Sequence, residues 1–141
     1  GPFQMTRAAR EALATGDGGV IVNVASIAGI AGAGSSIPYC ASKAALIVMT
    51  KSLARTLGPA IRVNAVAPGF IEGEWLQKGL GDDYEKAKQN RAAGNILNAV
   101  STPEDIADGI LTMATASKTT GHTLVVDAGD TLGPRIVQGL K

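Results

Sequence analysis

The sequence predicts a protein of the α/β class, with three parallel strands connected by crossover helices. Three short runs rich in valine and isoleucine, at residues 20–25, 61–66 and 123–127, are typical of strands. Helical patterns lie between these runs, and glycine or proline stands near most of their ends. Strands that alternate with helices pair in parallel through right-handed crossovers. The 141 residues suffice for one domain with a buried core.

The first half of the chain reads as helix, strand and helix. Residues 3–14 are expected to form a helix, because their apolar side chains fall on or near one face. Residues 20–25 are a charge-free run of the kind found in strands buried on both faces. We expect a loop of small residues over 26–36. Pro38 then stands at the first turn of an apolar helix over 39–57.

The second half begins with a strand and continues irregularly. The strand at 61–66 ends where Pro68 and Gly69 follow it. Residues 70–100 are the least regular part of the sequence, with a polar helical patch over 82–93.

A clear helix start follows at Thr102-Pro103-Glu104-Asp105. Thr102 is placed to cap the helix, and Asp105 stands three residues on, in the position of a capping box. The helix is expected to turn three apolar side chains inward, those of Ile106, Ile110 and Met113. The third strand, at 123–127, comes next.

Composition excludes several classes of function. The chain has 13 Lys and Arg against 12 Asp and Glu, without a basic patch, so nucleic acid is not an expected partner. Residues 18–42 carry no charge, but serines, Asn23 and Pro38 interrupt them, so we reject a membrane span. One cysteine, Cys40, and one histidine, His122, form neither a disulfide framework nor a zinc site. A single thiol fits a reducing, cytoplasmic compartment.

Candidate chemistry lies where the first strand ends. Ligands of open α/β sheets bind beyond the carboxyl ends of the strands. Ser26 directly follows the first strand, and Tyr39 and Lys43, four residues apart, share one face of the next helix. An ammonium beside a phenol favours the phenolate, so Tyr39 is a candidate general acid or base. Ser26 is placed to polarise a carbonyl or alkoxide oxygen.

Two other interpretations compete with this one. A tyrosine and a lysine four residues apart also arise by chance in chains of this length. Ser26 as a nucleophile is disfavoured, because no Gly-x-Ser-x-Gly turn surrounds it and the candidate base, His122, precedes a distant strand.

Read together, five segments carry a resemblance that the single pair does not. The sequence resembles the classical short-chain dehydrogenase/reductase family, most of all the branch that includes 3-oxoacyl-acyl-carrier-protein reductases and glucose dehydrogenases. The resemblance covers essentially the whole chain, and its Ser, Tyr-x-x-x-Lys and Pro-Gly elements are highly specific in combination. The segments that carry it are residues 23–29, 39–45, 62–69, 102–107 and 121–129.

The resemblance implies the C-terminal part of a Rossmann-type doubly wound sheet and an NAD- or NADP-dependent reaction on a small carbonyl or alcohol. It implies Tyr39 as the acid/base, Lys43 as its activator and a ligand of the nicotinamide ribose, and Ser26 as a ligand of the substrate oxygen. It also implies a nicotinamide pocket and a substrate lid. The pocket would be lined by Pro68, Gly69 and Ile71. The lid would be a mobile segment that includes Phe70 and Trp75 and extends to about Gly94, with core packing as the alternative for Trp75. No metal is implied.

The sequence departs from the family pattern in two places. Gly73 stands where the family usually has threonine, which puts one hydrogen bond to the cofactor in doubt. The family's N-terminal dinucleotide-binding half, including an asparagine of its catalytic set, does not occur in residues 1–141, which match the C-terminal half of one domain. The glycines at 29, 32 and 34 lack the order of a phosphate-binding loop, and we interpret them as a flexible loop beside the substrate.

A missing half would leave the strand at 20–25 with an open, apolar edge. Such an edge predicts aggregation, pairing with a complementary N-terminal fragment, or a sequence that omits residues. Alone, residues 1–141 should bind the cofactor poorly and turn over little.

The family also implies subunit contacts. Its members use the helices at 3–14 and 39–57 to form homo-oligomers, either dimers or tetramers. A non-catalytic scaffold member that keeps the fold for assembly is the alternative function.

Overall fold

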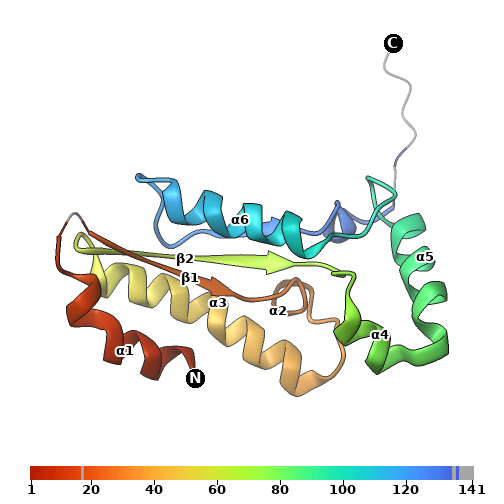
Figure 1. Ribbon diagram of the computed structural model, residues 1–141, viewed down its shortest axis with the longest axis horizontal. Helices are drawn as coiled ribbons and strands as arrows, with labels where there is room; N and C mark the ends of the chain where they lie inside the picture. The colour runs from red at the N-terminus through yellow and green to blue at the C-terminus, as the bar shows by residue number, and fades with distance from the viewer. Residues whose placement is uncertain (17, 135, 137–141) are drawn as a thin grey trace, which may run out of the picture.

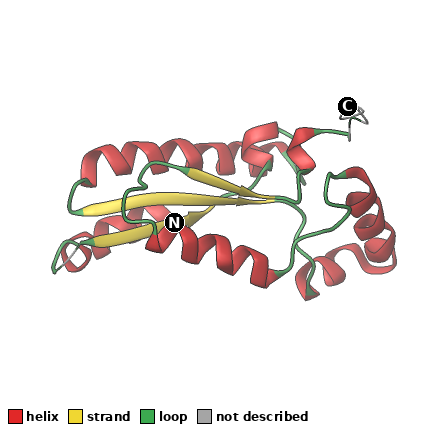
Figure 2. Ribbon diagram, turned by 90° about the horizontal axis from the view of Figure 1, so that it is seen from above, coloured by secondary structure: helices red, strands yellow, loops and turns green. Residues whose placement is uncertain are grey.

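Three parallel strands in the order β1-β2-β3 form the centre of the computed structural model, which describes residues 1–16, 18–134 and 136. Figure 2 shows them side by side with helices around them. The strands confirm the predicted α/β class and parallel pairing, and their bounds are Gly19–Val24 for β1, Ile61–Pro68 for β2 and Thr123–Val126 for β3.

The helices cover both faces of the sheet and extend past one end of it. α1 and α3 lie on one face and α6 on the other, while α4 and α5 lie beyond the carboxyl ends of the strands (Figure 1). Two short 3₁₀ turns complete the described chain. The bounds are Pro2–Leu13 for α1, Ala28–Ala31 for α2, Ile37–Leu57 for α3, Glu74–Leu80 for α4, Tyr84–Gly94 for α5, Pro103–Thr115 for α6, Gly81–Asp83 for η1 and Asp130–Leu132 for η2.

β2 is the most deeply buried element. Alternate side chains point to opposite faces of a strand, so Ile61 and Val63 pack against α3, and Val66 packs against α6. The two apolar clusters meet across this one strand, which pairs with a neighbour on each edge. β2 therefore fixes the positions of the other strands and of both helical layers.

The expectation that residues 20–25 are buried on both faces is confirmed only in part. Ile21 packs into the apolar cluster on the α3 side and Val22 into the cluster on the α6 side, but both are only half-buried, and Val24 is exposed. β1 pairs with β2 along one edge only, and among the described residues nothing pairs with its other edge. The partial exposure of β1 therefore results from its position at the edge of the sheet, which the apolar sequence of the strand does not indicate.

Two predicted irregular regions contain helices. α2 lies within the stretch that we expected to be a loop at 26–36, and α4 precedes the polar helix expected at 82–93. The two helices have only four and seven residues, so neither is long enough for a repeating apolar pattern to reveal it in the sequence. In the described part of the chain, no helix is both long enough and apolar enough to cross a membrane, and no cluster of metal-ligating side chains is found.

Arg62 joins α6 to the amino end of β2. Its guanidinium donates hydrogen bonds to four backbone carbonyls at and beyond the end of α6, those of Met113, Ala114, Ala116 and Thr119. Asn64 supports the same turn, since its amide donates to the carbonyl of Thr119 at 2.8 Å and accepts from the backbone N–H of His122 at 3.1 Å. A cation at a helix C-terminus is also favoured by the helix dipole.

The predicted capping box is present at the start of α6. The Thr102 hydroxyl accepts from the N–H of Asp105 at 3.2 Å, and the carboxylate of Asp105 accepts from the N–H of Thr102 at 2.8 Å. Thr102→Ala removes the side-chain acceptor, so it should lower the free energy of unfolding by about 1 kcal/mol in urea titrations. Thr102→Ser keeps the acceptor and should retain most of the stability. Equal losses in the two variants would contradict this role.

Candidate active site

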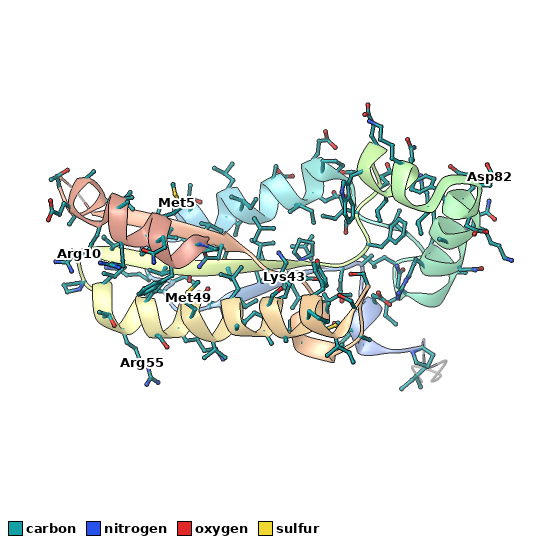
Figure 3. The ribbon with its side chains drawn as sticks, turned by 90° about the horizontal axis from the view of Figure 1, so that it is seen from below. Met5, Arg10, Lys43, Met49, Arg55 and Asp82 are labelled. Carbon is teal, nitrogen blue, oxygen red and sulfur yellow. The ribbon has the colours of Figure 1, made fainter. Side chains whose placement is uncertain are left out.

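Tyr39 and Lys43 lie on the first two turns of α3. Pro38 stands in the first turn, and the Ser36 hydroxyl caps it by accepting from the N–H of Tyr39 at 3.3 Å. Lys43 donates a hydrogen bond of 3.0 Å to the backbone carbonyl of Val24, at the end of β1. Its Nζ is also 5.7 Å from the centre of the Tyr39 ring. Figure 3 shows Lys43 beside the strands, whereas Arg55, farther along α3, points away from the molecule.

Ser26 lies two residues beyond the end of β1 and is 9% exposed. Its hydroxyl oxygen accepts a hydrogen bond of 3.1 Å from the N–H of Ala28, in the first turn of α2. The backbone directly after Ser26 is bonded to β2, because the N–H of Ile27 donates to the carbonyl of Pro68 at 3.0 Å. Ser26 is thus fixed between β2 and α2.

α2 brings Ser26 close to the Tyr39–Lys43 face of α3. At Gly29 a methyl group would stand 2.5 Å from the carbonyl carbon of Lys43, so only glycine permits this approach. At Gly34 a methyl group would stand 2.8 Å from the Ala28 side chain and 3.4 Å from the Tyr39 ring. The interpretation of these glycines as a flexible loop is therefore wrong at Gly29, which belongs to a helix packed tightly on α3.

A buried polar pair holds β1 against α3 below this face. Asn23 donates a hydrogen bond of 2.9 Å to the hydroxyl of Thr50, which in turn donates to the backbone carbonyl of Leu46. Thr50 is fully buried, and both side chains are satisfied. Buried polar groups of this kind specify one register of packing, so the pair sets the distance between the strand end and α3.

The end of β2 forms the opposite side of the site. Pro68 is buried, and Gly69 is so close to Asp127 that a methyl group at Gly69 would stand 2.8 Å from the Asp127 Cβ. Ile71 forms a parallel bridge with Ser101, in which the neighbours of Ile71 make the hydrogen bonds. The N–H and C=O of Ile71 face away from Ser101, and neither has a hydrogen-bond partner among the described residues.

Asp127 organises the loop after β3. One carboxylate oxygen accepts from the N–H of Gly129 at 2.8 Å, and the other accepts from the N–H and the hydroxyl of Thr131 at 2.8 and 2.7 Å. Burial of the carboxyl acts to raise the pKa of Asp127, but these hydrogen bonds outweigh burial, so the pKa lies below its usual value. The sequence predicted that Asp127 lies at the end of the third strand, but it did not indicate that the carboxylate organises the loop that follows.

The predicted lid segment is partly helical. The Phe70 ring packs against Tyr84 with 6.4 Å between ring centres, and the Tyr84 hydroxyl accepts from the N–H of Gly73 at 3.3 Å. Trp75 on α4 is 82% exposed, so its alternative interpretation as a core residue is wrong. Gly73 directly precedes α4. Its φ of 155° is a conformation that few other residues adopt.

Fold and site thus define an α/β protein with a tyrosine, a lysine and a serine gathered beyond the carboxyl end of a parallel strand. The family model described as Enoyl-(Acyl carrier protein) reductase matches residues 1–131. The short-chain dehydrogenase/reductase homolog YusR of Bacillus subtilis is 39% identical over 132 residues, which cover 94% of this chain and 98% of that relative. The chain therefore belongs to the short-chain dehydrogenase/reductase family, whose members are oxidoreductases.

Two further relatives are longer than the chain. The 3-oxoacyl-[acyl-carrier-protein] reductase FabG of Rickettsia bellii is 40% identical over 130 residues, covering 90% of this chain and 52% of that relative. The crystal structure of a small-chain dehydrogenase in complex with NADPH superposes with a TM-score of 0.83 at 30% identity, covering 91% of this chain and 57% of that one. The chain spans about half the length of several curated relatives that it matches, although it spans nearly all of YusR.

The Asp127 carboxylate should make stability depend on acid pH. Its folded pKa lies below the unfolded value of 3.8, so its contribution is present at neutral pH and is lost as pH falls through the folded pKa. Asp127→Asn should lower stability at pH 7 and flatten its fall in acid, measured by urea unfolding at a series of pH values. Asp108→Asn, on the exposed surface of α6, is the control. An unchanged acid profile in Asp127→Asn would contradict the assignment.

Proposed function

We propose that the protein carrying this chain is an NAD(P)-dependent oxidoreductase that interconverts a carbonyl and a secondary alcohol. The observation that carries the proposal is the arrangement of Tyr39 and Lys43 on one helical face, with Lys43 bonded to the end of β1 and Ser26 held beside them through α2. Family membership supports the reaction class.

Tyr39 is the proposed acid and base. Its side chain is 38% exposed, and its hydroxyl makes no hydrogen bond among the described residues, so it is free to meet a substrate oxygen. During reduction, the hydroxyl gives its proton to the carbonyl oxygen as the carbonyl carbon receives a hydride, and the reverse occurs during oxidation. The Lys43 ammonium, 5.7 Å from the centre of the Tyr39 ring, places a positive charge near the oxygen that has lost its proton.

Ser26 is the proposed ligand of the substrate oxygen. Its hydroxyl oxygen is already occupied by the N–H of Ala28, which leaves the hydroxyl hydrogen to be donated. A fixed donor of this kind stabilises the negative charge that develops on the carbonyl oxygen during hydride transfer.

The donor groups fit the ribose and nicotinamide end of the cofactor. When bound, NADH or NADPH supplies the hydride. Lys43 uses one of its three N–H groups on Val24, so two remain for ribose hydroxyls. The N–H and C=O of Ile71 offer the donor and the acceptor that a carboxamide requires, beside Pro68 and Gly69.

The described residues do not fit the pyrophosphate in the same way. Gly29 and Gly34 pack against α3, whereas a methyl group at Gly32 would meet no atom within 4 Å, and we assign no phosphate cradle to these glycines. The choice between NAD and NADP is therefore left open in the proposal.

The proposed substrate region is the segment that follows β2. Phe70 is half-buried near the end of the strand, and Trp75 offers an exposed indole on α4. Such side chains suit an apolar or acyl-bearing carbonyl compound, in keeping with the 3-oxoacyl reductase among the relatives.

We also propose that residues 1–141 are the C-terminal half of one domain and that a dinucleotide-binding half pairs with β1. The open edge of β1 supports this, since its N–H and C=O groups can extend the sheet by parallel pairing. Exposed apolar side chains on α1 and α3, including Phe3, Met5 and Val48, support a homo-oligomer, either a dimer or a tetramer. The cytoplasmic location stays a prediction.

Tyr39→Phe tests the chemistry. Removing the acid should lower the rate of NADPH-dependent reduction of a 3-oxoacyl thioester by about 10²-fold to 10⁴-fold, while circular dichroism and oligomeric state stay unchanged. Ser26→Ala should also lower the rate, with a smaller loss. Retained turnover in Tyr39→Phe would contradict the proposal and favour a scaffold role.

Lys43→Met should lower the rate and weaken NADPH binding together. Lys51→Met is the matched control, because Lys51 lies two turns farther along α3 and is exposed. Equal effects of the two substitutions would show that Lys43 acts only through the general charge of the helix.

The proposed pairing of β1 with a dinucleotide-binding half makes a separate prediction. If a complementary chain pairs with β1, intact mass spectrometry of the purified protein should find it, and NADPH should bind tightly only to the paired form. Val22→Pro, in the middle of β1, should prevent this pairing, because proline lacks the backbone N–H that would bond to a neighbouring strand. Tight NADPH binding by the chain alone would overturn this part of the proposal.

A further inference from the structure

The inner face of α5 carries small apolar side chains beside larger polar ones. Ala87 and Ala92 are half-buried there, and Tyr84, Lys88 and Arg91, spaced by four and three residues, lie on the same side of the helix. Among the described residues of α5, Tyr84 is the buried one, at 5% exposure. Two alanines bury little apolar surface, so polar contacts add to the docking of α5.

Each of these three side chains contacts a loop at the carboxyl edge of the sheet. Tyr84 packs against Phe70 and accepts from the N–H of Gly73. Lys88 forms an ion pair with Glu72, with both side chains about one-third exposed. The Glu72 hydrogen bond is the main factor that raises the pKa of Lys88, which stays charged at physiological pH.

Arg91 extends the same face to the second loop. It forms an ion pair of 3.3 Å with Asp130, which lies in the loop that Asp127 folds after β3. α5 is therefore attached to the segment after β2 and to the segment after β3 at the same time.

Both attachment points adjoin the backbone of the proposed cofactor site. Glu72 follows Ile71, and its N–H donates to the carbonyl of Ser101 at 2.9 Å, in the bridge that turns the free peptide groups of Ile71 outward. Asp130 belongs to the loop whose first residue, Asp127, packs against Gly69. α5 is thus linked through Glu72 and Asp130 to the segments that adjoin Ile71 and Gly69.

We propose that Lys88 and Arg91 are positioning residues, which couple the substrate lid to the cofactor site through Glu72 and Asp130. This inference rests on the proposed function. Half-exposed ion pairs are weak and are screened by salt, so they allow α5 to move while biasing it toward the docked position. Docking of α5 and binding of the dinucleotide should favour each other, because coupling between two sites is reciprocal.

Charge reversal tests the coupling in the whole protein. Lys88→Glu places two carboxylates together, so it should raise the NADPH Kd and the substrate KM about threefold to tenfold, with a smaller change in kcat. Glu72→Lys should do the same, and the double swap Glu72→Lys/Lys88→Glu should restore both constants. Lys86→Glu is the matched control, because Lys86 lies on the same helix, is exposed and has no ion pair among the described residues.

Hydrogen exchange adds a measurement that does not depend on turnover. NADPH should slow amide exchange across α5 in the unaltered protein and in the double swap, and it should do so less in Lys88→Glu. Raising the salt concentration should weaken NADPH binding more in the unaltered protein than in Glu72→Gln/Lys88→Gln.

The outcomes separate this inference from the proposed function. If Tyr39→Phe abolishes turnover while Lys88→Glu behaves like Lys86→Glu, the coupling is wrong and the reaction stands. If the double swap fails to restore binding, the ion pair is not the link, and the inference is also overturned. If the unaltered protein transfers no hydride, the proposed function itself fails.

Discussion

The double pairing of β2 is the constraint on which the rest of the molecule depends. Because β2 has a neighbour on each edge and a helical layer on each face, the carboxyl ends of all three strands come to one side. Ser26, Gly69 and Asp127 follow those three ends directly or within two residues. α3 then brings its first two turns to the same side, where Lys43 bonds to the end of β1. The position of the site is therefore determined first by the parallel pairing of the strands and only then by individual side chains.

The body of the molecule and its carboxyl edge are held by different kinds of interaction. The body is held by apolar contacts on both sides of β2, in which Val63 and Val66 are fully buried. The carboxyl edge is held mainly by hydrogen bonds and ion pairs, such as those of Asp127 and Lys88. Partly exposed ion pairs such as that of Lys88 and Glu72 form and break more readily than an apolar core. A rigid body therefore carries an edge that can adjust to a ligand.

Periodicity and turn chemistry predicted the strands, the long helices and the capping box at Thr102, because those signals are local. The Tyr39–Lys43 pair was predictable for the same reason, since helical spacing alone puts both on one face. Contacts between distant segments were not predictable from one sequence. Gly29 resembled part of a loop because its requirement comes from Lys43, on another helix. Lys88 and Glu72 lie sixteen positions apart and share no motif.

The hydrogen bonds of Arg62 have a consequence for the amino end of β2, which lies opposite the site. Its partners are four peptide carbonyls rather than a carboxylate, and peptide carbonyls do not titrate in the range where proteins fold. The junction of α6 with β2 is therefore indifferent to protons, whereas the loop after β3 depends on the ionised Asp127. Acidification down to the lowered pKa of Asp127 would act on the end of the molecule that carries the proposed chemistry and would leave the hydrogen bonds of Arg62 intact, so that loss of the site and loss of the fold become separable events.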